Sequence, residues 1–180
     1  MSSDYHSFDD MYRKHVDEIY RFLFFRVVTA PIAKQPEFIT EDLTQQTFVK
    51  AFEIYQQNRT DMQWRPWLYK VARSKFVDWL RKKRPEPISP DETGKIDSGM
   101  DVERTVQLSI QTSQMYEALR HLEERDQLII ELYVLAQLSA REVALVVGCL
   151  AQNVARYKYV AVKRLCAKLK DLGFLDSDVE

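Results

Sequence analysis

Residues 138–148 read Leu-Ser-Ala-Arg-Glu-Val-Ala-Leu-Val-Val-Gly, and this stretch holds the clearest local signals in the chain. Ser139 and Glu142 have the spacing of a capping box, in which a serine begins a helix and a glutamate three residues later bonds back to it. Five apolar residues follow, and Gly148 then supplies the backbone freedom that a helix end and a tight turn need. The stretch therefore predicts a short helix that ends at Gly148.

The residues around this turn are typical of a helix-turn-helix. Ala144 is small enough to let a second helix approach, Gly148 makes the turn, and Val154 is the apolar anchor of the next helix. That helix is predicted over about 151–172, and its first twenty residues include six basic side chains and no acidic one. A helical hairpin inside an unrelated bundle has the same local pattern, but the basic charge favours DNA binding.

Outward from this motif, apolar residues at helical spacing predict further helices on both sides of a polar linker. Two short helices upstream complete a four-helix domain over 113–175. Residues 85–112 contain three prolines, two glycines and six acidic against two basic residues, which is typical of a linker, with a short helix around 101–110. Residues 1–84 hold three amphipathic helices, which are enough for a separate bundle.

Capping residues and prolines place the three N-terminal helices. Ser7 and Thr40 are expected to cap the first and second helices, because acidic residues follow each of them. Pro36 is assigned to the break between those helices, Pro66 stands near the start of the third, and Pro85 ends it. We therefore predict an all-α fold of two small helical domains, a three-helix bundle and a four-helix unit, joined by a flexible acidic linker.

Composition narrows the classes of function. Glycine is absent from residues 1–93, so no glycine-rich phosphate loop is predicted there. The three histidines are scattered, and the two cysteines lack the spacing of a metal-ligand pair. No catalytic residue, metal or cofactor is therefore expected. The N-terminus lacks a signal-peptide stretch, and the longest apolar run, near 22–28, is interrupted by Arg26. We expect a soluble, cytoplasmic protein without membrane insertion.

The formal charge of −1 conceals two basic helices in an otherwise acidic chain. Residues 63–84 carry eight basic side chains and one acidic one, interleaved with aromatic residues. Basic side chains beside aromatic platforms suit single-stranded or opened nucleic acid. The alternative is that the aromatic side chains belong to the core. Both interpretations stay open for Trp64 and Tyr69, and the core is the better interpretation for Trp67, Phe76 and Trp79.

Three stretches of the chain resemble, in order and spacing, parts of one protein family. Residues 41–52, which read EDLTQQTFVKAF, look like the polymerase-binding helix of sigma-factor region two, and residues 65–81 resemble the helix that follows it. Residues 138–148 resemble region four. The chain is thus similar to the bacterial RNA polymerase sigma factors of the sigma-70 family, extracytoplasmic-function type. This resemblance implies a region-two domain at 1–84, a linker at 85–112 and a region-four domain at 113–175.

The resemblance implies a transcription initiation factor, not an enzyme, that binds core RNA polymerase and directs it to specific promoters. The implied partners are the clamp coiled coil and flap of core polymerase, promoter DNA and an anti-sigma factor. The implied polymerase contacts are Asp42, Gln45, Gln46 and Phe48. The expected contacts to the opened minus-ten element are Trp64, Arg73, Ser74, Lys75, Asp78, Arg81 and Lys82. The expected contacts to the minus-thirty-five element are Gln152, Asn153, Arg156, Tyr157, Lys158, Tyr159, Lys163 and Arg164.

Several positions depart from the family pattern. Gln46 stands where a glutamate is usual, which weakens a charge-assisted contact to polymerase. Ser74 replaces a common asparagine, Leu150 stands where a serine or threonine often caps the recognition helix, and Ala155 replaces a polar or basic residue. Residues 58–63 lie where family members capture a flipped base. The resemblance therefore says least about which bases the chain prefers at the two promoter elements.

The spacing of two promoter elements sets a length that the linker has to reach. Elements about 25 base pairs apart are separated by roughly 85 Å along the duplex. Two domains of about 25 Å each leave a gap of about 60 Å. That gap is within the roughly 90 Å reach of a stretched linker but exceeds its relaxed span of about 30 Å. Promoter binding therefore requires domains that stand well apart, with polymerase holding the linker extended.

A stand-alone helix-turn-helix regulator is the alternative function. In that case the N-terminal bundle serves as a sensor or a dimerisation domain, and the protein binds duplex DNA without polymerase. An acidic, glutamine-bearing helix directly before a basic, aromatic one argues against this alternative.

Overall fold

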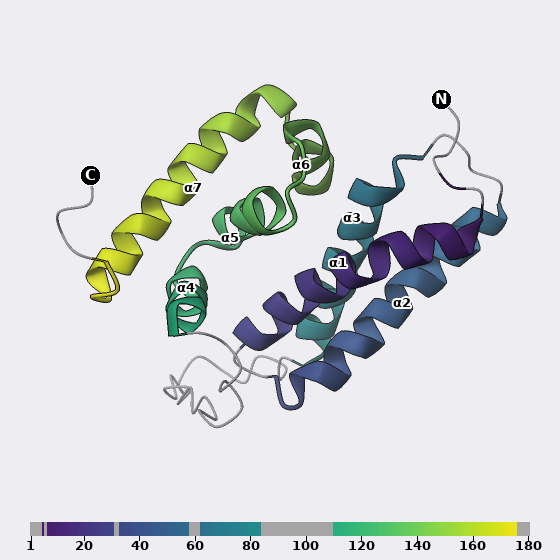
Figure 1. The fold of residues 1–180 in the computed structure, drawn as a ribbon, viewed down its shortest axis with the longest axis horizontal. Helices are drawn as coiled ribbons and strands as arrows, with labels where there is room; N and C mark the ends of the chain where they lie inside the picture. Colours follow the sequence, from purple (N-terminus) through teal and green to yellow (C-terminus); the bar gives the residue numbers. More distant parts are fainter. Residues whose placement is uncertain (1–4, 6, 31–32, 58–61, 84–109, 176–180) are drawn as a thin grey trace, which may run out of the picture.

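The computed structural model describes residues 5, 7–30, 33–57, 62–83 and 110–175. All regular structure in this part of the chain is helical, as predicted (Figure 1). Residues 84–109 lie outside the described residues, and they include most of the predicted linker and of the short helix expected around 101–110. Residues 58–61 of the loop assigned to base capture lie outside them as well. None of the described helices is long and apolar enough to cross a membrane.

The N-terminal domain consists of α1 (Phe8–Thr29), α2 (Pro36–Gln56) and α3 (Trp64–Lys83). The first two helices lie side by side and α3 crosses both of them (Figure 1). Ser7 caps α1 as predicted, because its Oγ accepts a hydrogen bond of 3.1 Å from the Asp10 N–H. The core between the three helices includes Leu23, Leu43 and Leu68, each almost fully buried.

The prediction that Thr40 caps the second helix was wrong. Helix α2 begins one turn earlier, at Pro36, after Gln35 in the left-handed conformation at φ 61°. Proline suits the first helical position because it has no N–H to leave unpaired. The Thr40 hydroxyl donates instead to the Pro36 carbonyl at 2.7 Å, within the helix. Local sequence favoured a cap at Thr40, but proline was the actual helix start.

The C-terminal domain consists of α4 (Ile110–Arg120), α5 (Glu124–Ile130), α6 (Ala140–Val147) and α7 (Ala151–Asp171). A π-helical turn, η2 (Glu131–Leu135), continues α5 directly. The predicted capping box is present: the Ser139 N–H donates to Glu142 Oε2 at 2.8 Å, and Ser139 Oγ accepts from the Glu142 N–H at 3.4 Å. Gly148 ends α6 at φ 78°, also as predicted.

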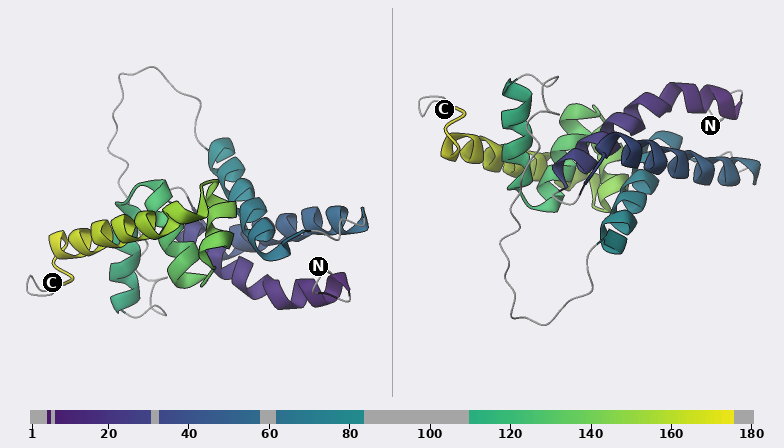
Figure 2. Two further views of the ribbon diagram at one scale, coloured as in Figure 1. Left: turned by 90° about the horizontal axis from the view of Figure 1, so that it is seen from above. Right: turned by 90° about the horizontal axis from the view of Figure 1, so that it is seen from below.

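The two domains pack directly against each other. Helix α6 lies against α3, α4 approaches α1, and Arg73 of α3 pairs with Glu124 of α5 (Figures 1 and 2). One apolar cluster contains Leu68 and Phe76 of the N-terminal domain together with Leu132 and Val143 of the C-terminal domain. This arrangement differs from the well-separated domains that promoter spacing requires. Short helices such as α5 and α6 bury little apolar surface alone, so the cluster shared with the N-terminal domain supplies part of their core.

Candidate nucleic-acid and polymerase interfaces

Helix α3 presents most of its predicted minus-ten residues at or near its surface. Ser74, Arg81 and Lys82 are exposed, and Arg73, Lys75 and Asp78 are half-buried. Arg81 Nη2 lies 3.0 Å from Asp78 Oδ1 of the preceding turn, an exposed pair that leaves the guanidinium accessible. The helix ends with three basic side chains, at Arg81, Lys82 and Lys83. This end of α3 is a cationic surface suited to a phosphate backbone.

For two aromatic residues of α3, the sequence left open whether the ring belongs to the core or is available to nucleic acid, and the structure decides between the two. Trp64 and Tyr69 are both core residues, with 4% and 0% of their surface exposed. The Trp64 ring centroid lies 5.6 Å from that of Trp67, and the Tyr69 ring packs edge-on to Phe22 at 5.1 Å. Burial also raises the pKa of the Tyr69 hydroxyl. Trp64, predicted to contact DNA, is therefore not available for stacking on a base in this conformation.

Helix α2 carries the predicted polymerase contacts on its outer face. Asp42, Gln45 and Gln46 are exposed, and Gln46 Nε2 donates to Asp42 Oδ2 at 2.9 Å. Phe48 is buried instead, with its ring edge-on to Tyr12 at 4.8 Å. Two apolar residues of the same helix, Val49 and Phe52, are exposed as well, and sequence reasoning did not single them out.

Helix α7 buries its predicted apolar anchor and exposes several of its predicted DNA contacts. Val154 is 1% exposed. The exposed residues among the predicted contacts are Gln152, Arg156, Tyr159, Lys163 and Arg164, whereas Asn153, Tyr157 and Lys158 are half-buried.

Three of the predicted contacts on α7 interact within the C-terminal domain. Lys158 Nζ lies 3.9 Å from the ring centroid of Tyr133. Tyr157 packs into the second apolar cluster, under the guanidinium of Arg125. Arg164 Nη1 lies 2.5 Å from Asp126 Oδ2, and the Asp126 side chain is only 2% exposed. These three side chains hold α7 to the rest of the domain.

Arg65 joins the two domains, a role that its place among the basic residues of α3 did not reveal. Its guanidinium donates to Glu18 Oε2 at 3.0 Å and to the Ala136 carbonyl at 2.7 Å. It also lies 3.9 Å from the capping-box residue Glu142. Burial acts to raise the pKa of Glu18, but hydrogen bonds from His15 and Arg65 outweigh it and lower that pKa.

A second link between the domains is the buried ion pair of Arg26 and Glu131. Arg26 Nε donates to Glu131 Oε2 at 2.8 Å, and the two side chains are 3% and 2% exposed. The Arg26 guanidinium also lies over the rings of Phe22 and Phe76, 5.3 and 5.5 Å from their centroids. Burial raises the pKa of Glu131 to about 7, even though Arg26 acts to lower it. In the sequence, Arg26 was visible only as an interruption of an apolar run.

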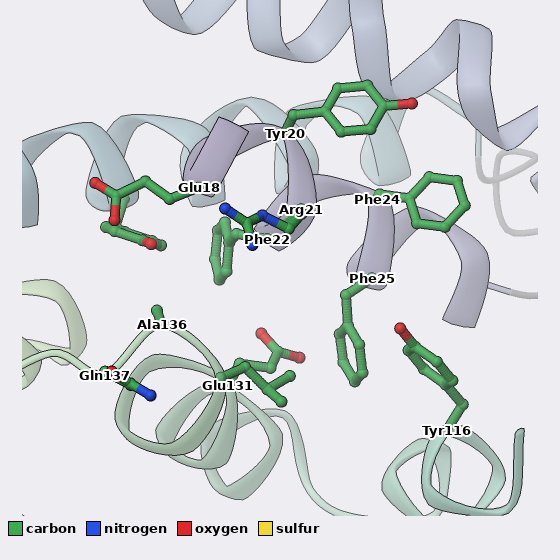
Figure 3. A pocket seen from close by; sticks show the side chains of 12 residues that line it. Glu18, Tyr20, Arg21, Phe22, Phe24, Phe25, Tyr116, Glu131, Ala136 and Gln137 are labelled. Atoms are coloured by element: carbon green, nitrogen blue, oxygen red, sulfur yellow. The ribbon is translucent and has the colours of Figure 1, made fainter. Parts of the chain in front are cut away.

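A pocket of about 520 Å³ lies next to this ion pair, between α1 and the C-terminal domain. Phe22 and Phe25 of α1 face Tyr116 and Glu131 across it (Figure 3). The domains therefore meet along α3 and at the Arg26–Glu131 pair, and the pocket lies beside that pair. Within the described residues, no group of three or more potential metal ligands is assembled.

An all-helical scaffold with one basic helical surface in each domain is typical of two-domain nucleic-acid-binding proteins. The family model for sigma-70 region 2 matches residues 11–86. The chain is 27% identical to the extracytoplasmic-function sigma factor SigM of Bacillus subtilis over 164 residues, which is 88% of this chain and 93% of SigM. It is 28% identical to the sigma factor BldN of Streptomyces coelicolor over 170 residues, or 92% of this chain and 61% of BldN.

Solved structures agree with this assignment at the level of the fold. The structure of CnrH in complex with the cytosolic domain of CnrY covers 91% of this chain and 88% of that chain, with a TM-score of 0.64 and 21% identity. RpoE of Bartonella quintana, crystallised with the anti-sigma factor NepR, covers 89% of this chain and 97% of that chain, with a TM-score of 0.61 and 19% identity. The chain belongs to the sigma-70 family of RNA polymerase sigma factors, extracytoplasmic-function type. It directs RNA polymerase to promoters and is not itself an enzyme.

Proposed function

We propose that three helices divide the work of promoter recognition: α2 binds core polymerase, α3 holds the opened minus-ten element and α7 enters the major groove at the minus-thirty-five element. The observation that carries this assignment is the presence of one exposed basic helical surface in each domain. A promoter with two separated elements needs two such surfaces, and a single-site DNA-binding protein needs one.

At the polymerase, Asp42, Gln45 and Gln46 are proposed to contact the clamp coiled coil. They are exposed on one face of α2 and provide carboxylate and amide groups for hydrogen bonds. Val49 and Phe52 add apolar area to this surface, being 60% and 45% exposed. Phe48 is buried and packs α2 against α1, so it is not a direct polymerase contact in this proposal.

At the minus-ten element, the proposed contacts are the polar and basic side chains of α3. Arg81 and Lys82 at the exposed end of the helix contact phosphates, because a cationic helix end attracts the backbone whatever the sequence. Ser74 and Asp78 offer hydrogen-bonding groups to bases of the opened strand. The remaining proposed contacts are Arg73 and Lys75.

At the minus-thirty-five element, the exposed front of α7 is proposed to read base edges. Gln152, Asn153 and Arg156 carry the side chains that bond bidentately to adenine and guanine. Lys163, two turns further along the helix, contacts phosphate. Tyr159 is 68% exposed and adds an apolar surface for a thymine methyl group.

The proposed partners are core RNA polymerase, through its clamp coiled coil and flap, promoter DNA and an anti-sigma factor, in the cytoplasm. The support for the anti-sigma partner is that two proteins of the same fold, CnrH and RpoE, were crystallised with protein partners, in the second case a named anti-sigma factor.

In vitro transcription with core bacterial polymerase on fragmented genomic DNA tests the proposal. We expect discrete start sites that require the protein and that share two sequence elements. Variants Arg81→Ala and Arg156→Ala are expected to lose transcription from these sites. Duplex DNA binding by the protein alone, with no association with core polymerase, would instead establish the stand-alone regulator.

A further inference from the structure

We infer that the pocket beside the Arg26–Glu131 pair is a binding site for a small aromatic molecule that carries an N–H or O–H group. The ring of this ligand packs among the aromatic side chains of the pocket, and its N–H or O–H group donates to Glu131 Oε1. None of the proposed polymerase or DNA contacts lines the pocket, so this site is independent of the function proposed above.

The size and the lining of the pocket favour a flat, largely apolar ligand. Its volume of about 520 Å³ is within the range of small-molecule sites. Six of its twelve lining residues carry an aromatic ring: Tyr20, Phe22, Phe24, Phe25, Tyr69 and Tyr116. Aromatic rings prefer to stack or to pack edge-on against other rings. The lining residues Arg21 and Gln137 are exposed, whereas the aromatic residues Phe22 and Phe25 are buried, so the pocket has a polar rim and an apolar interior.

The Glu131 carboxylate provides a hydrogen-bond acceptor within this apolar interior. Arg26 Nε donates to Glu131 Oε2 at 2.8 Å, but Oε1 has no hydrogen-bond partner within the described residues. The Glu131 side chain is 2% exposed and points toward α1, with Phe22 and Phe25 on either side (Figure 3). Leaving a buried acceptor unpaired costs free energy, which a ligand with an N–H or O–H group offsets. This group can be neutral, because the Arg26 guanidinium already balances the charge of the carboxylate.

The wall of the pocket that carries Glu131 has an uncommon backbone conformation. Helix η2 is a π-helical turn, in which the Ala136 N–H donates at 2.8 Å to the Glu131 carbonyl, five residues back. Gln137 follows in the left-handed conformation, at φ 51°. Such turns and left-handed residues other than glycine occur often at functional sites, where surrounding contacts hold them in place. Here the Ala136 carbonyl accepts from Arg65 at 2.7 Å, so the wall is fixed before any ligand binds.

The test compares indole with benzofuran, in which an oxygen atom replaces the N–H group of the same fused rings. Indole can donate to Glu131 Oε1, and benzofuran cannot. Each is titrated into the isotope-labelled full chain, and NMR amide shifts measure the dissociation constant and locate the site. In the variant Glu131→Gln, Arg26 can only donate, so it takes the amide oxygen and leaves the NH₂ group toward the pocket. The matched control, Glu123→Gln, makes the same change at an exposed residue of the same domain that does not line the pocket.

We expect indole to bind about tenfold more tightly than benzofuran, with amide shifts centred on Glu131, Ala136 and Gln137. This preference is expected to persist in Glu123→Gln and to be lost in Glu131→Gln. Equal affinities in the unaltered chain, or a preference that survives Glu131→Gln, would overturn the role assigned to Glu131. Shifts that are absent or lie away from the pocket would overturn the site itself and leave a cavity for water only. The comparison of the two ligands uses the unaltered chain, so it decides the matter even if circular dichroism shows that Glu131→Gln does not fold.

Discussion

At the scale of single residues, burial changes the ionisation of charged side chains in this protein. Arg26 and Glu131 would be ordinary solvated charges on isolated helices, but the packed domains remove both from water. The cost of burying a carboxylate then exceeds the attraction of its partner, so the pKa of Glu131 rises to about 7. The groups that act on this carboxylate are Arg26 and Arg73, which lower its pKa, and Glu124, which raises it further.

This shift predicts a pH dependence of stability. The pKa of Glu131 in the folded chain lies above its ordinary value of 4.5, so its contribution is fully present below pH 4.5 and is lost as the pH rises through about 7. Substitution by glutamine, Glu131→Gln, mimics the protonated form and removes this contribution to the pH dependence. We expect the stability of the variant relative to that of the unaltered chain to rise between pH 5 and pH 8, on top of a pH-independent cost of leaving the buried Arg26 guanidinium without a carboxylate partner. Thermal unfolding of both proteins at pH 5, 6.5 and 8 measures this relative stability. A relative stability that falls as the pH rises would contradict the sign.

Gly148 provides a second prediction at this scale. Its φ of 78° is a left-handed conformation, and an added Cβ would meet no atom within 4 Å. The cost of Gly148→Ala is therefore conformational and is expected to be about 1 kcal/mol. Gly148→Asn is the matched control, since asparagine tolerates this conformation better. Chemical denaturation is expected to rank the stabilities glycine, then asparagine, then alanine; equal stability of the alanine and asparagine variants would contradict the explanation.

At the scale of elements, helix α7 combines residues that face outward with residues that hold it in place. Arg156 is exposed, whereas Arg164 is paired with the buried Asp126. Their substitution by alanine therefore has different consequences. We expect Arg156→Ala to reduce discrimination between minus-thirty-five sequences by about 1–3 kcal/mol without loss of domain stability. Arg164→Ala is expected to destabilise the domain by about 1–3 kcal/mol, because it leaves the Asp126 carboxylate buried without its partner. Transcription from promoter variants, together with thermal unfolding, separates the two effects, and the reverse pattern would exchange the roles assigned to these arginines.

Helix α3 belongs to this scale as well, since its exposed end and its buried middle differ in character. Arg81 and Lys82 are exposed at the end of the helix. Replacing both with alanine is expected to weaken binding to single-stranded oligonucleotides about equally for all base sequences. The slope of log affinity against log salt concentration is expected to fall by about 0.7 for each phosphate that the variant no longer neutralises. Titrations at several salt concentrations measure that slope. An unchanged slope would show that neither side chain binds phosphate.

At the scale of the whole molecule, the contact between the two domains predicts that binding to polymerase and binding to DNA respond differently to the same substitutions. Glu124→Lys together with Glu131→Lys places like charges opposite Arg73 and Arg26, which weakens this contact. The double variant is expected to bind core polymerase within about twofold of the unaltered chain, because Asp42, Gln45 and Gln46 are exposed while the domains are in contact. Its affinity for a single-stranded oligonucleotide is expected to rise, because Arg73 loses its carboxylate partner. Competition binding to labelled core polymerase measures the first quantity. A large change in polymerase affinity would mean that the contact between the domains also affects the polymerase surface.

Much of the architecture could be predicted because its signals are local. Ser7, the Ser139–Glu142 capping box and Gly148 act within one helical turn, so their effect does not depend on the rest of the fold. Helical periodicity and local charge likewise identify the basic helices α3 and α7 from sequence alone. The start of α2 is the exception: it was predicted at the wrong residue, because Thr40 and Pro36 gave competing local signals for one helix end.

The remaining properties depend on which helical faces meet, and only the tertiary structure decided them. Arg26 and Glu131 are separated by 105 positions in the chain, and no periodicity pairs two residues so far apart. Whether Trp64 and Phe48 face a partner or the core likewise depends on the angle at which their helices cross. The sequence by itself determined the helices, the caps at Ser7, Ser139 and Gly148, and the charges that each helix carries. The packing of the two domains against each other determined which of those charges face solvent, because only long-range contacts can remove a side chain from water.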